Sequence, residues 1–235
     1  SKAVAPMLRF ASRGPFRRVG RSGERMPTLL MMHGMTGTAD MMRPFAEAIL
    51  PEGWTLLVPE GRFPHPRRGC AWWRYEDWSA SPTRRANLSR TELFDVDASL
   101  AQLEQEVARH APAGPLVVGG FSMGGAMAQE MLHLPLADRI IGVIALGTRL
   151  IRPMELRLRL EELERKHLFW MHGERDVRVP IEDGWAIAHL FEDAGWATEL
   201  IEHPKGHMIP TEHHAAVKEW LEALADGWDA ATQAR

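Results

Sequence analysis

The sequence predicts an α/β fold built on a mostly parallel central sheet. Two observations predict it: short, continuously apolar segments recur along the chain, and segments with a helical spacing of apolar residues lie between them. Continuous apolar runs of this length are typical of strands that are buried on both faces of a parallel sheet. Strands that alternate with helices favour a parallel sheet covered by helices on both faces.

The strands and helices follow one another in a regular order. The apolar runs predict strands at Pro27–His33, Trp54–Pro59, Pro115–Phe121, Ile140–Gly147, His167–His172 and Ala197–Glu202. The helical spacing predicts helices at Ala39–Leu50, Leu93–His110, Met123–Leu134, Pro180–Ala194 and about His213–Ala225. The first 25 residues contain Gly14-Pro15 and Arg21-Ser22-Gly23, which indicate an antiparallel hairpin at one edge of the sheet.

Two segments fit this alternation poorly. Gly61–Arg90 would be an unusually long loop, and such loops are usually functional or disordered. Its tryptophans argue against disorder. Arg149–Lys166 has features of both a strand and a helix, and we favour a helix. Because only Thr148–Lys166 is available between the fourth and fifth strands, we expect no large lid over the site.

Composition bounds the class of protein. The chain has 235 residues, 45% of them hydrophobic and 25% charged, which is typical of a single globular domain spanning residues 1–235. Its net charge of −3 gives no general attraction for nucleic acid or anionic membranes. No apolar run reaches the roughly 18 residues of a membrane span, so we expect no stable membrane insertion. The single cysteine, Cys70, cannot form an intrachain disulfide, and we expect a cytoplasmic protein.

The strongest motif is the G-x-S-x-G sequence Gly120–Gly124. It follows the apolar run Leu116–Val118 and opens the predicted helix Met123–Leu134, which is the strand–turn–helix context that this motif requires. A sharp turn there would leave no room for a Cβ at either glycine and would present the Ser122 hydroxyl at the carboxyl edge of the sheet. We predict that Ser122 is a nucleophile. The alternative is a glycine-rich turn without chemistry.

A serine nucleophile needs a histidine base that is oriented by a carboxylate. In this architecture the order along the chain is Ser, acid, His, and Asp176 and His207 follow the fifth and sixth strands in that order. Both would lie at carboxyl ends of strands, where open α/β sheets place their sites. Nearby residues remain alternatives: Glu174 and Asp183 for the acid, and His203, His213 and His214 for the base.

Two backbone N–H groups are expected to stabilise an oxyanion. One belongs to Met123, the residue after the nucleophile. The other should come from the loop after the first strand, and we favour Met35 there. For His33 in this loop a structural hydrogen-bonding role is expected. The histidines also invite a metal interpretation, but the Cys or carboxylate spacing of zinc sites is absent, so neither a metal nor a cofactor is expected.

Together these motifs resemble those of the α/β-hydrolase superfamily and, within it, the phospholipase/carboxylesterase group that includes acyl-protein thioesterases. The resemblance is carried by His33-Gly34-Met35 with Thr36-Gly37, Gly119–Gly125, His172-Gly173-x-x-Asp176-x-x-Val179-Pro180, Gly206-His207 and Trp72-Trp73-Arg74. It implies an α/β-hydrolase fold from about residue 27 to the C-terminus. Met123 departs from the glutamine that is common in the group, which keeps the backbone donor and removes a polar side chain.

The sequence therefore predicts a serine hydrolase that cleaves carboxylic esters or thioesters by way of an acyl-enzyme. Trp72 and Trp73 are candidates to line the substrate pocket. The expected partner is a small ester or thioester, and exposed tryptophan makes a homodimer possible. Two other functions remain open: a non-catalytic protein that binds a small ligand on the same fold, and a lactone or carbon–carbon bond hydrolase that uses the same three residues.

Overall fold

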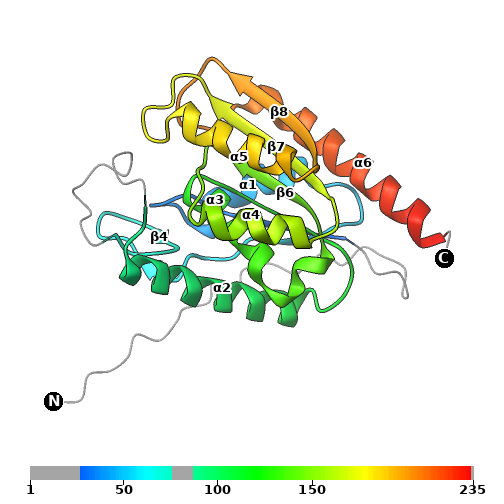
Figure 1. Cartoon of the computed structure of the whole chain (residues 1–235), viewed down its shortest axis with the longest axis horizontal. Coiled ribbons are helices and arrows are strands. Elements are labelled where there is room, and N and C mark those ends of the chain that lie inside the picture. The colour runs from blue at the N-terminus through cyan, green and yellow to red at the C-terminus, as the bar shows by residue number, and fades with distance from the viewer. Residues whose placement is uncertain (1–26, 76–86, 234–235) are drawn as a thin grey trace.

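The computed structural model describes residues 27–75 and 87–233, with side chains as far as residue 225. Its centre is a six-stranded sheet in the order β2-β1-β5-β6-β7-β8, with every neighbouring pair parallel (Figure 1). The strands are β1 (Thr28–Met32), β2 (Thr55–Leu57), β5 (Leu116–Phe121), β6 (Ile140–Leu146), β7 (His167–Gly173) and β8 (Ala197–His203). The prediction of a mostly parallel α/β sheet is confirmed.

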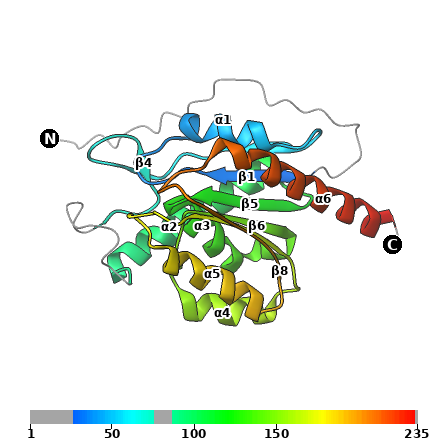
Figure 2. The same cartoon turned by 90° about the horizontal axis from the view of Figure 1, so that it is seen from above.

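Helices cover both faces of this sheet. The α-helices are α1 (Ala39–Ile49), α2 (Arg90–His110), α3 (Met123–Glu130), α4 (Pro153–Glu162), α5 (Ile181–Asp193) and α6 (His214–Gln233). Short 3₁₀ turns lie at Met131–His133, Pro135–Arg139 and Thr211–His213. Figure 2 shows α1 and α6 on one side of the sheet, with α3, α4 and α5 on the other. The predicted two-faced arrangement is therefore confirmed.

The core is divided by the sheet into two apolar layers. In β1, Leu29 and Met31 pack in the layer of α1 and α6, whereas Leu30 and Met32 pack in the layer of α2 to α5. All four side chains are fully buried. This alternation follows from the two-residue period of a strand, and it explains why each strand is apolar throughout.

Capping hydrogen bonds explain why a helix can begin a few residues away from its predicted start. α2 begins at Arg90, three residues before the predicted Leu93, because Ser89 and Glu92 form a capping box there. The Glu92 N–H donates to the Ser89 hydroxyl at 3.2 Å, and the Glu92 carboxylate accepts the Ser89 N–H at 2.8 Å. At α1 the Thr38 hydroxyl accepts the Met41 N–H at 3.2 Å.

The poorly fitting segments have different outcomes. Arg149–Lys166 contains α4, as favoured, and this single helix is what the chain places between β6 and β7. Part of Gly61–Arg90 forms a two-stranded antiparallel sheet of β3 (Phe63–Pro64) and β4 (Cys70–Ala71), which was not predicted. The N-terminal hairpin predicted for the first 25 residues lies outside the described residues.

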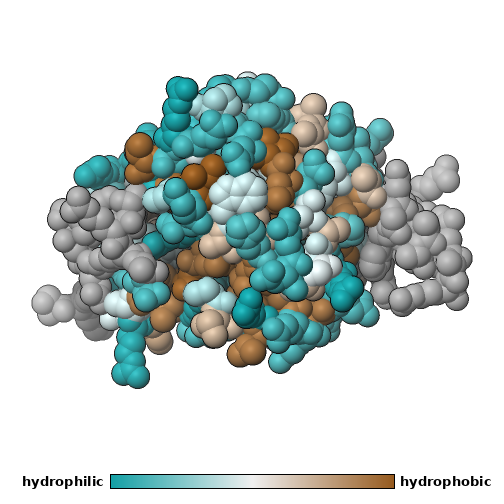
Figure 3. All heavy atoms as spheres, turned by 45° about the horizontal axis from the view of Figure 1, so that its top comes forward, coloured by the Kyte–Doolittle hydropathy of each residue, from teal (hydrophilic) through white to brown (hydrophobic). Residues whose placement is uncertain are grey.

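The surface mixes apolar and polar residues. On the face in Figure 3, hydrophobic residues form several small groups among hydrophilic ones. None of the helices in the described part of the chain has the length and apolar character that a membrane crossing requires.

The strand register brings one set of loops together. Met32 pairs with Gly120, Phe121 with Leu146, and Leu146 with Met171, so these strands end at a common edge. The strand order changes direction between β1 and β5, because β2 lies on one side of β1 and every later strand of the sheet lies on the other. Open α/β sheets bind ligands at such a point. The loops after β1, β5, β7 and β8 are therefore the place to look for a site.

Candidate active site

The turn after β5 holds Ser122 in a strained backbone conformation. Its φ of 54° and ψ of −118° lie in a region that L-residues rarely adopt, and apart from Thr36 it is the only described non-glycine residue with a positive φ. A Cβ on Gly120 would collide with the backbone of Gly124, and one on Gly124 would collide with the Met32 carbonyl. The predicted need for both glycines is confirmed, and the turn has the geometry of a nucleophile elbow.

Hydrogen bonds with β6, with the residue two positions after β6 and with α3 keep this turn in place. The Ser122 N–H donates to the Leu146 carbonyl at 2.8 Å, and the Ser122 carbonyl accepts the Ala126 N–H at 3.1 Å. The Thr148 hydroxyl donates to the same carbonyl at 2.6 Å. Thr148 is buried and follows Gly147, whose φ is +50°. Sequence reasoning missed Thr148, because nothing local to it marks a partner 26 residues away.

Asp176 and His207 meet at the ends of β7 and β8. The Nδ1 atom of His207 lies 2.6 Å from Oδ2 of Asp176, and the Asp176 side chain is fully buried. The other carboxylate oxygen accepts the N–H groups of Arg178 at 2.8 Å and of Val179 at 2.9 Å. The structure thus brings together the two residues that the sequence selected for the acid and the base.

These contacts keep the Asp176 carboxylate ionised. Burial raises the pKa of Asp176, but the hydrogen bonds from His207, Val179 and Arg178 outweigh it and leave the pKa below its ordinary value. An ionised carboxylate can only accept, so His207 donates its Nδ1–H and leaves Nε2 unprotonated in the neutral ring. A histidine in this form can take a proton at Nε2.

The His207 ring also lies against the serine turn. Its centroid is 4.6 Å from that of Phe121, the residue that precedes Ser122. A Cβ on Gly147 would lie 3.6 Å from His207 Nδ1. The histidine therefore packs against the ends of β5 and β6, next to the residue that precedes the predicted nucleophile.

His172 supports the acid loop from beneath. Its side chain is fully buried, its Nε2–H donates to the Val179 carbonyl at 2.9 Å, and Nε2 lies 3.6 Å from Asp176 Oδ2. Burial lowers the pKa of His172, which keeps the ring neutral. The ring thus closes the loop that carries Asp176. In the sequence, His172 was noted only as part of the motif His172-Gly173-x-x-Asp176, and its contact with the Val179 carbonyl was not predicted.

The alternative acids and bases lie elsewhere. Glu174 and Asp183 are exposed. His203 is buried and accepts the Lys205 N–H at 3.3 Å, with its ring 6.1 Å from that of His213. His214 packs against Phe45 with ring centroids 4.9 Å apart. The contacts described for these histidines are with groups other than Asp176.

The loop after β1 approaches the serine from the opposite side. A Cβ on Gly34 would lie 3.3 Å from the Cβ of Ser122, so this loop borders the nucleophile. His33 donates its Nδ1–H to the Gly34 carbonyl at 2.8 Å and accepts the Gly61 N–H on Nε2 at 2.9 Å. Burial lowers the pKa of His33. The expected structural role of His33 is confirmed, and half-buried Met35 follows in the same loop.

Trp72 and Trp73 are buried. Their exposed fractions are 0% and 2%, and both belong to the core layer of α2 to α5. Trp78, the third tryptophan of the segment, lies outside the described residues. The substrate-lining role of Trp72 and Trp73 stays a prediction.

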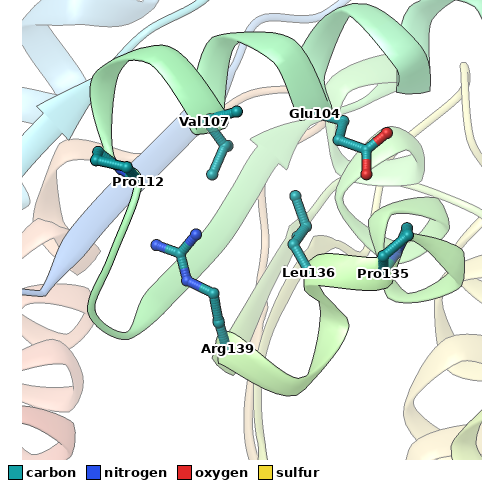
Figure 4. A pocket seen from close by; sticks show the side chains of 7 residues that line it. Glu104, Val107, Pro112, Pro135, Leu136 and Arg139 are labelled. Atoms are coloured by element: carbon teal, nitrogen blue, oxygen red, sulfur yellow. The ribbon is translucent and has the colours of Figure 1, made fainter.

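A shallow cavity of about 330 Å³ lies apart from these loops. It is formed between α2 and the 3₁₀ turn Pro135–Arg139, as Figure 4 shows. None of its lining residues belongs to the loops around Ser122, and we assign it no role in the chemistry. Within residues 27–75 and 87–225, no group of three or more His, Cys, Asp or Glu side chains is arranged to hold a metal ion.

A parallel sheet with a strained serine turn after one strand and an Asp–His pair after two later ones defines an α/β-hydrolase. The chain belongs to the phospholipase/carboxylesterase family, whose sequence model matches residues 19–225. The resemblance drawn from the motifs is thereby confirmed.

Named relatives match parts of the chain. It is 29% identical over 150 residues to acyl-protein thioesterase 1 of Neurospora crassa, which covers 62% of this chain and 60% of that protein. It is 27% identical over 122 residues to a probable carboxylesterase of Oryza sativa subsp. japonica, with coverage of 52% and 46%. Each match spans less than two thirds of the relative's own length.

Solved structures share the fold over most of their length. SOBER1 of Arabidopsis thaliana has a TM-score of 0.68 at 20% identity and covers 85% of this chain and 99% of its own. Acyl-protein thioesterase 2 of Zea mays has a TM-score of 0.67 at 20% identity, covering 90% and 99%. At this level of identity the likeness shows the fold alone.

Proposed function

We propose that this protein is a serine hydrolase that cleaves carboxylic esters or thioesters with Ser122, His207 and Asp176. The observation that carries the proposal is the 2.6 Å hydrogen bond between His207 Nδ1 and Asp176 Oδ2, next to a serine held at a positive φ. A neutral histidine with a free Nε2 beside a strained serine is what nucleophilic acyl transfer requires.

The first half of the reaction forms an acyl-enzyme. Ser122 Oγ attacks the carbonyl carbon while His207 Nε2 takes the hydroxyl proton, and the carbonyl π electrons move onto oxygen. Asp176, ionised and held by two backbone N–H groups, stabilises the imidazolium. The backbone N–H groups of Met35 and Met123 donate to the oxyanion. Collapse expels the alcohol or thiol, which leaves with the proton from His207.

The second half restores the serine. His207 takes a proton from a water molecule, whose oxygen attacks the acyl carbon and forms a second oxyanion. The bond to Ser122 Oγ then breaks, the proton returns to that oxygen, and the carboxylic acid leaves. Because every proton moves through one histidine and no electron is transferred to a cofactor, the chemistry needs only the protein and water.

The relatives support the reaction class. The family and the two named relatives include a thioesterase and a probable carboxylesterase. Oxygen and sulfur esters share the same acyl-enzyme step and differ in the leaving group, so the proposal includes both. A single domain, a cytoplasmic location and a homodimer stay predictions.

A covalent probe tests the proposal. A fluorophosphonate should add once to the native protein, as seen by intact mass, and peptide mapping should place the adduct on Ser122. His207→Ala should abolish or strongly slow the labelling because the serine then lacks its base. His110→Ala, which replaces an exposed histidine at the end of α2, is the matched control and should still be labelled at Ser122. A folded protein that takes no adduct would favour a non-catalytic ligand-binding function instead.

A further inference from the structure

Trp72 donates a hydrogen bond to each side of the proposed oxyanion site. Its indole Nε1–H donates to the His33 carbonyl at 2.8 Å, in a buried environment. That carbonyl belongs to the peptide unit joining His33 to Gly34, so its direction fixes how the chain enters the Gly34–Met35 turn. The rings of His33 and Trp72 also lie 5.2 Å apart, centroid to centroid.

The main chain of Trp72 reaches the other proposed donor. Its N–H lies 3.2 Å from Sδ of Met123, whose side chain is buried. A thioether sulfur is a weak acceptor. Even so, a buried N–H that makes this weak bond is more stable than one that has no partner at all. Met123 is the first residue of α3 and offers its own N–H to the oxyanion, so this contact links Trp72 to the second side of the site.

α2 fixes Trp72 itself. The hydroxyl of Ser99 donates to the Trp72 carbonyl. Arg74, two residues after Trp72, is also held by α2. Asp95 accepts its backbone N–H at 3.0 Å and its guanidinium N–H groups at 2.8 and 2.9 Å. The hydrogen bond from Arg74 holds the pKa of Asp95 below its ordinary value, so the carboxylate is charged. The N–H, the carbonyl and the indole of Trp72 are thus all engaged.

The same segment holds the loop after β1 at further points. The Thr36 N–H donates to the Cys70 carbonyl at 3.0 Å, and the Cys70 N–H donates to the Gly37 carbonyl at 2.8 Å. A Cβ on Gly69 would collide with the Thr36 carbonyl, so the two backbones are in close contact. Residues 61–72, which we call the brace, therefore clamp the loop that carries Met35.

From these contacts we infer that Trp72 is the positioning residue of the oxyanion site: it sets the relative placement of the Met35 and Met123 N–H groups. This inference rests on the proposed function. Trp72 touches neither substrate nor nucleophile, and it acts through the His33 carbonyl and the Met123 side chain. Donors aimed at an oxyanion lose much of their effect when they are displaced by as little as about 1 Å.

Trp72→Phe tests the inference, because phenylalanine keeps an aromatic ring and lacks the indole N–H. We expect kcat for a p-nitrophenyl ester to fall about 10- to 100-fold while KM changes less than about twofold, since the oxyanion exists only in the transition state. Binding of a trifluoromethyl ketone, whose serine adduct carries an oxyanion, should weaken in parallel. The apparent pKa of the kcat/KM profile should stay unchanged, because the Asp176–His207 pair is untouched.

Trp196→Phe is the matched control. Trp196 is also buried, with 4% of its surface exposed, but its Nε1 has no hydrogen-bond partner among the described residues. It lies just before β8, away from the carboxyl edge of the sheet. Its replacement should cost thermal stability with little change in kcat. If Trp72→Phe does not fold, Ser99→Ala provides the second variant, with an expected fall in kcat of about threefold at constant KM.

The outcomes separate this inference from the proposed function. A wild-type protein without Ser122-dependent turnover overturns the proposed function itself. An active wild type together with a folded Trp72→Phe variant of unchanged kcat and unchanged ketone binding overturns only the role of Trp72. Equal losses of kcat in Trp72→Phe and Trp196→Phe would indicate general packing and would also overturn it.

Discussion

The two sides of the proposed site are held in place by different means. On one side, Asp176 meets His207 through a single side-chain hydrogen bond, and the carboxylate is fixed by N–H groups two and three residues along its own loop. On the other side, the loop after β1 is held by the brace, whose residues lie roughly 30 to 40 positions further along the chain, and the brace in turn is held by α2.

This difference decides what a sequence can reveal. A carboxylate that is held within its own loop leaves a short motif, such as His172-Gly173-x-x-Asp176, because the N–H groups that hold it lie within three residues. In the loop after β1, the motif His33-Gly34-Met35-Thr36-Gly37 does not reveal what holds it, because its partners depend on how separate segments pack. Both loops nevertheless form two backbone hydrogen bonds with a distant segment: the Glu174 and Arg175 N–H groups donate to the His203 and Lys205 carbonyls, and two such bonds join Thr36 and Gly37 to Cys70.

Among substitutions that keep both Ser122 and His207, we expect Asp176→Asn to lower kcat the most. An amide can donate to His207 Nδ1 and thereby favour the tautomer that has no free Nε2, so we expect kcat to fall by about 10³- to 10⁴-fold. Steady-state kinetics on a p-nitrophenyl ester measure this loss. Asp183→Asn, an exposed acid of the same region, should retain kcat within about twofold. Equal losses in both variants would contradict the assignment of the acid.

A smaller effect is expected from Glu130, a buried carboxyl on α3 outside both sides of the site. Burial raises its pKa to about 7, although Arg152 lies 3.3 Å away. The folded protein therefore holds a proton between about pH 4.5 and 7 that the unfolded chain releases, and the group makes the free energy of unfolding fall as pH rises through this window. Well above pH 7 the folded protein has also released this proton, and Glu130 no longer changes the free energy of unfolding with pH.

Glu130→Gln, which resembles the protonated form, should remove this pH dependence. Relative to wild type, the variant should gain about 2–3 kcal/mol of unfolding free energy between pH 5 and pH 8, as measured by urea denaturation. Its kcat should stay within about twofold. The exposed Glu47→Gln is the control and should show no such trend. A constant difference between Glu130→Gln and wild type across this range would show that Glu130 does not titrate there.

Much of the fold was predictable because its signals are local. Each of the six strands expected between residues 27 and 202 is present, and the expected order Ser122, Asp176, His207 follows from loops that the parallel register brings to one edge. Helix starts were less accurate: the Ser89-x-x-Glu92 capping box can be read from the sequence, but it was not used. The small sheet of β3 and β4 was missed because strands of two residues have no periodicity to detect.

The roles of several site residues depended on packing instead. Trp72 lies in a long aromatic segment, but its hydrogen bonds to the His33 carbonyl and the Met123 side chain cannot be read from that segment. Thr148 and His172 hold the serine turn and the acid loop through hydrogen bonds to backbone carbonyls. Which carbonyl a buried hydroxyl or imidazole reaches is decided by the tertiary arrangement, so no pattern along the chain predicts it.

The most direct test of the central claim is ester turnover by Ser122→Ala compared with wild type. Removing the hydroxyl deletes the attacking oxygen but little packing, so we predict that turnover of a p-nitrophenyl ester falls to background while the thermal unfolding midpoint stays nearly unchanged. Turnover retained by the folded variant would contradict the claim that Ser122 is the nucleophile.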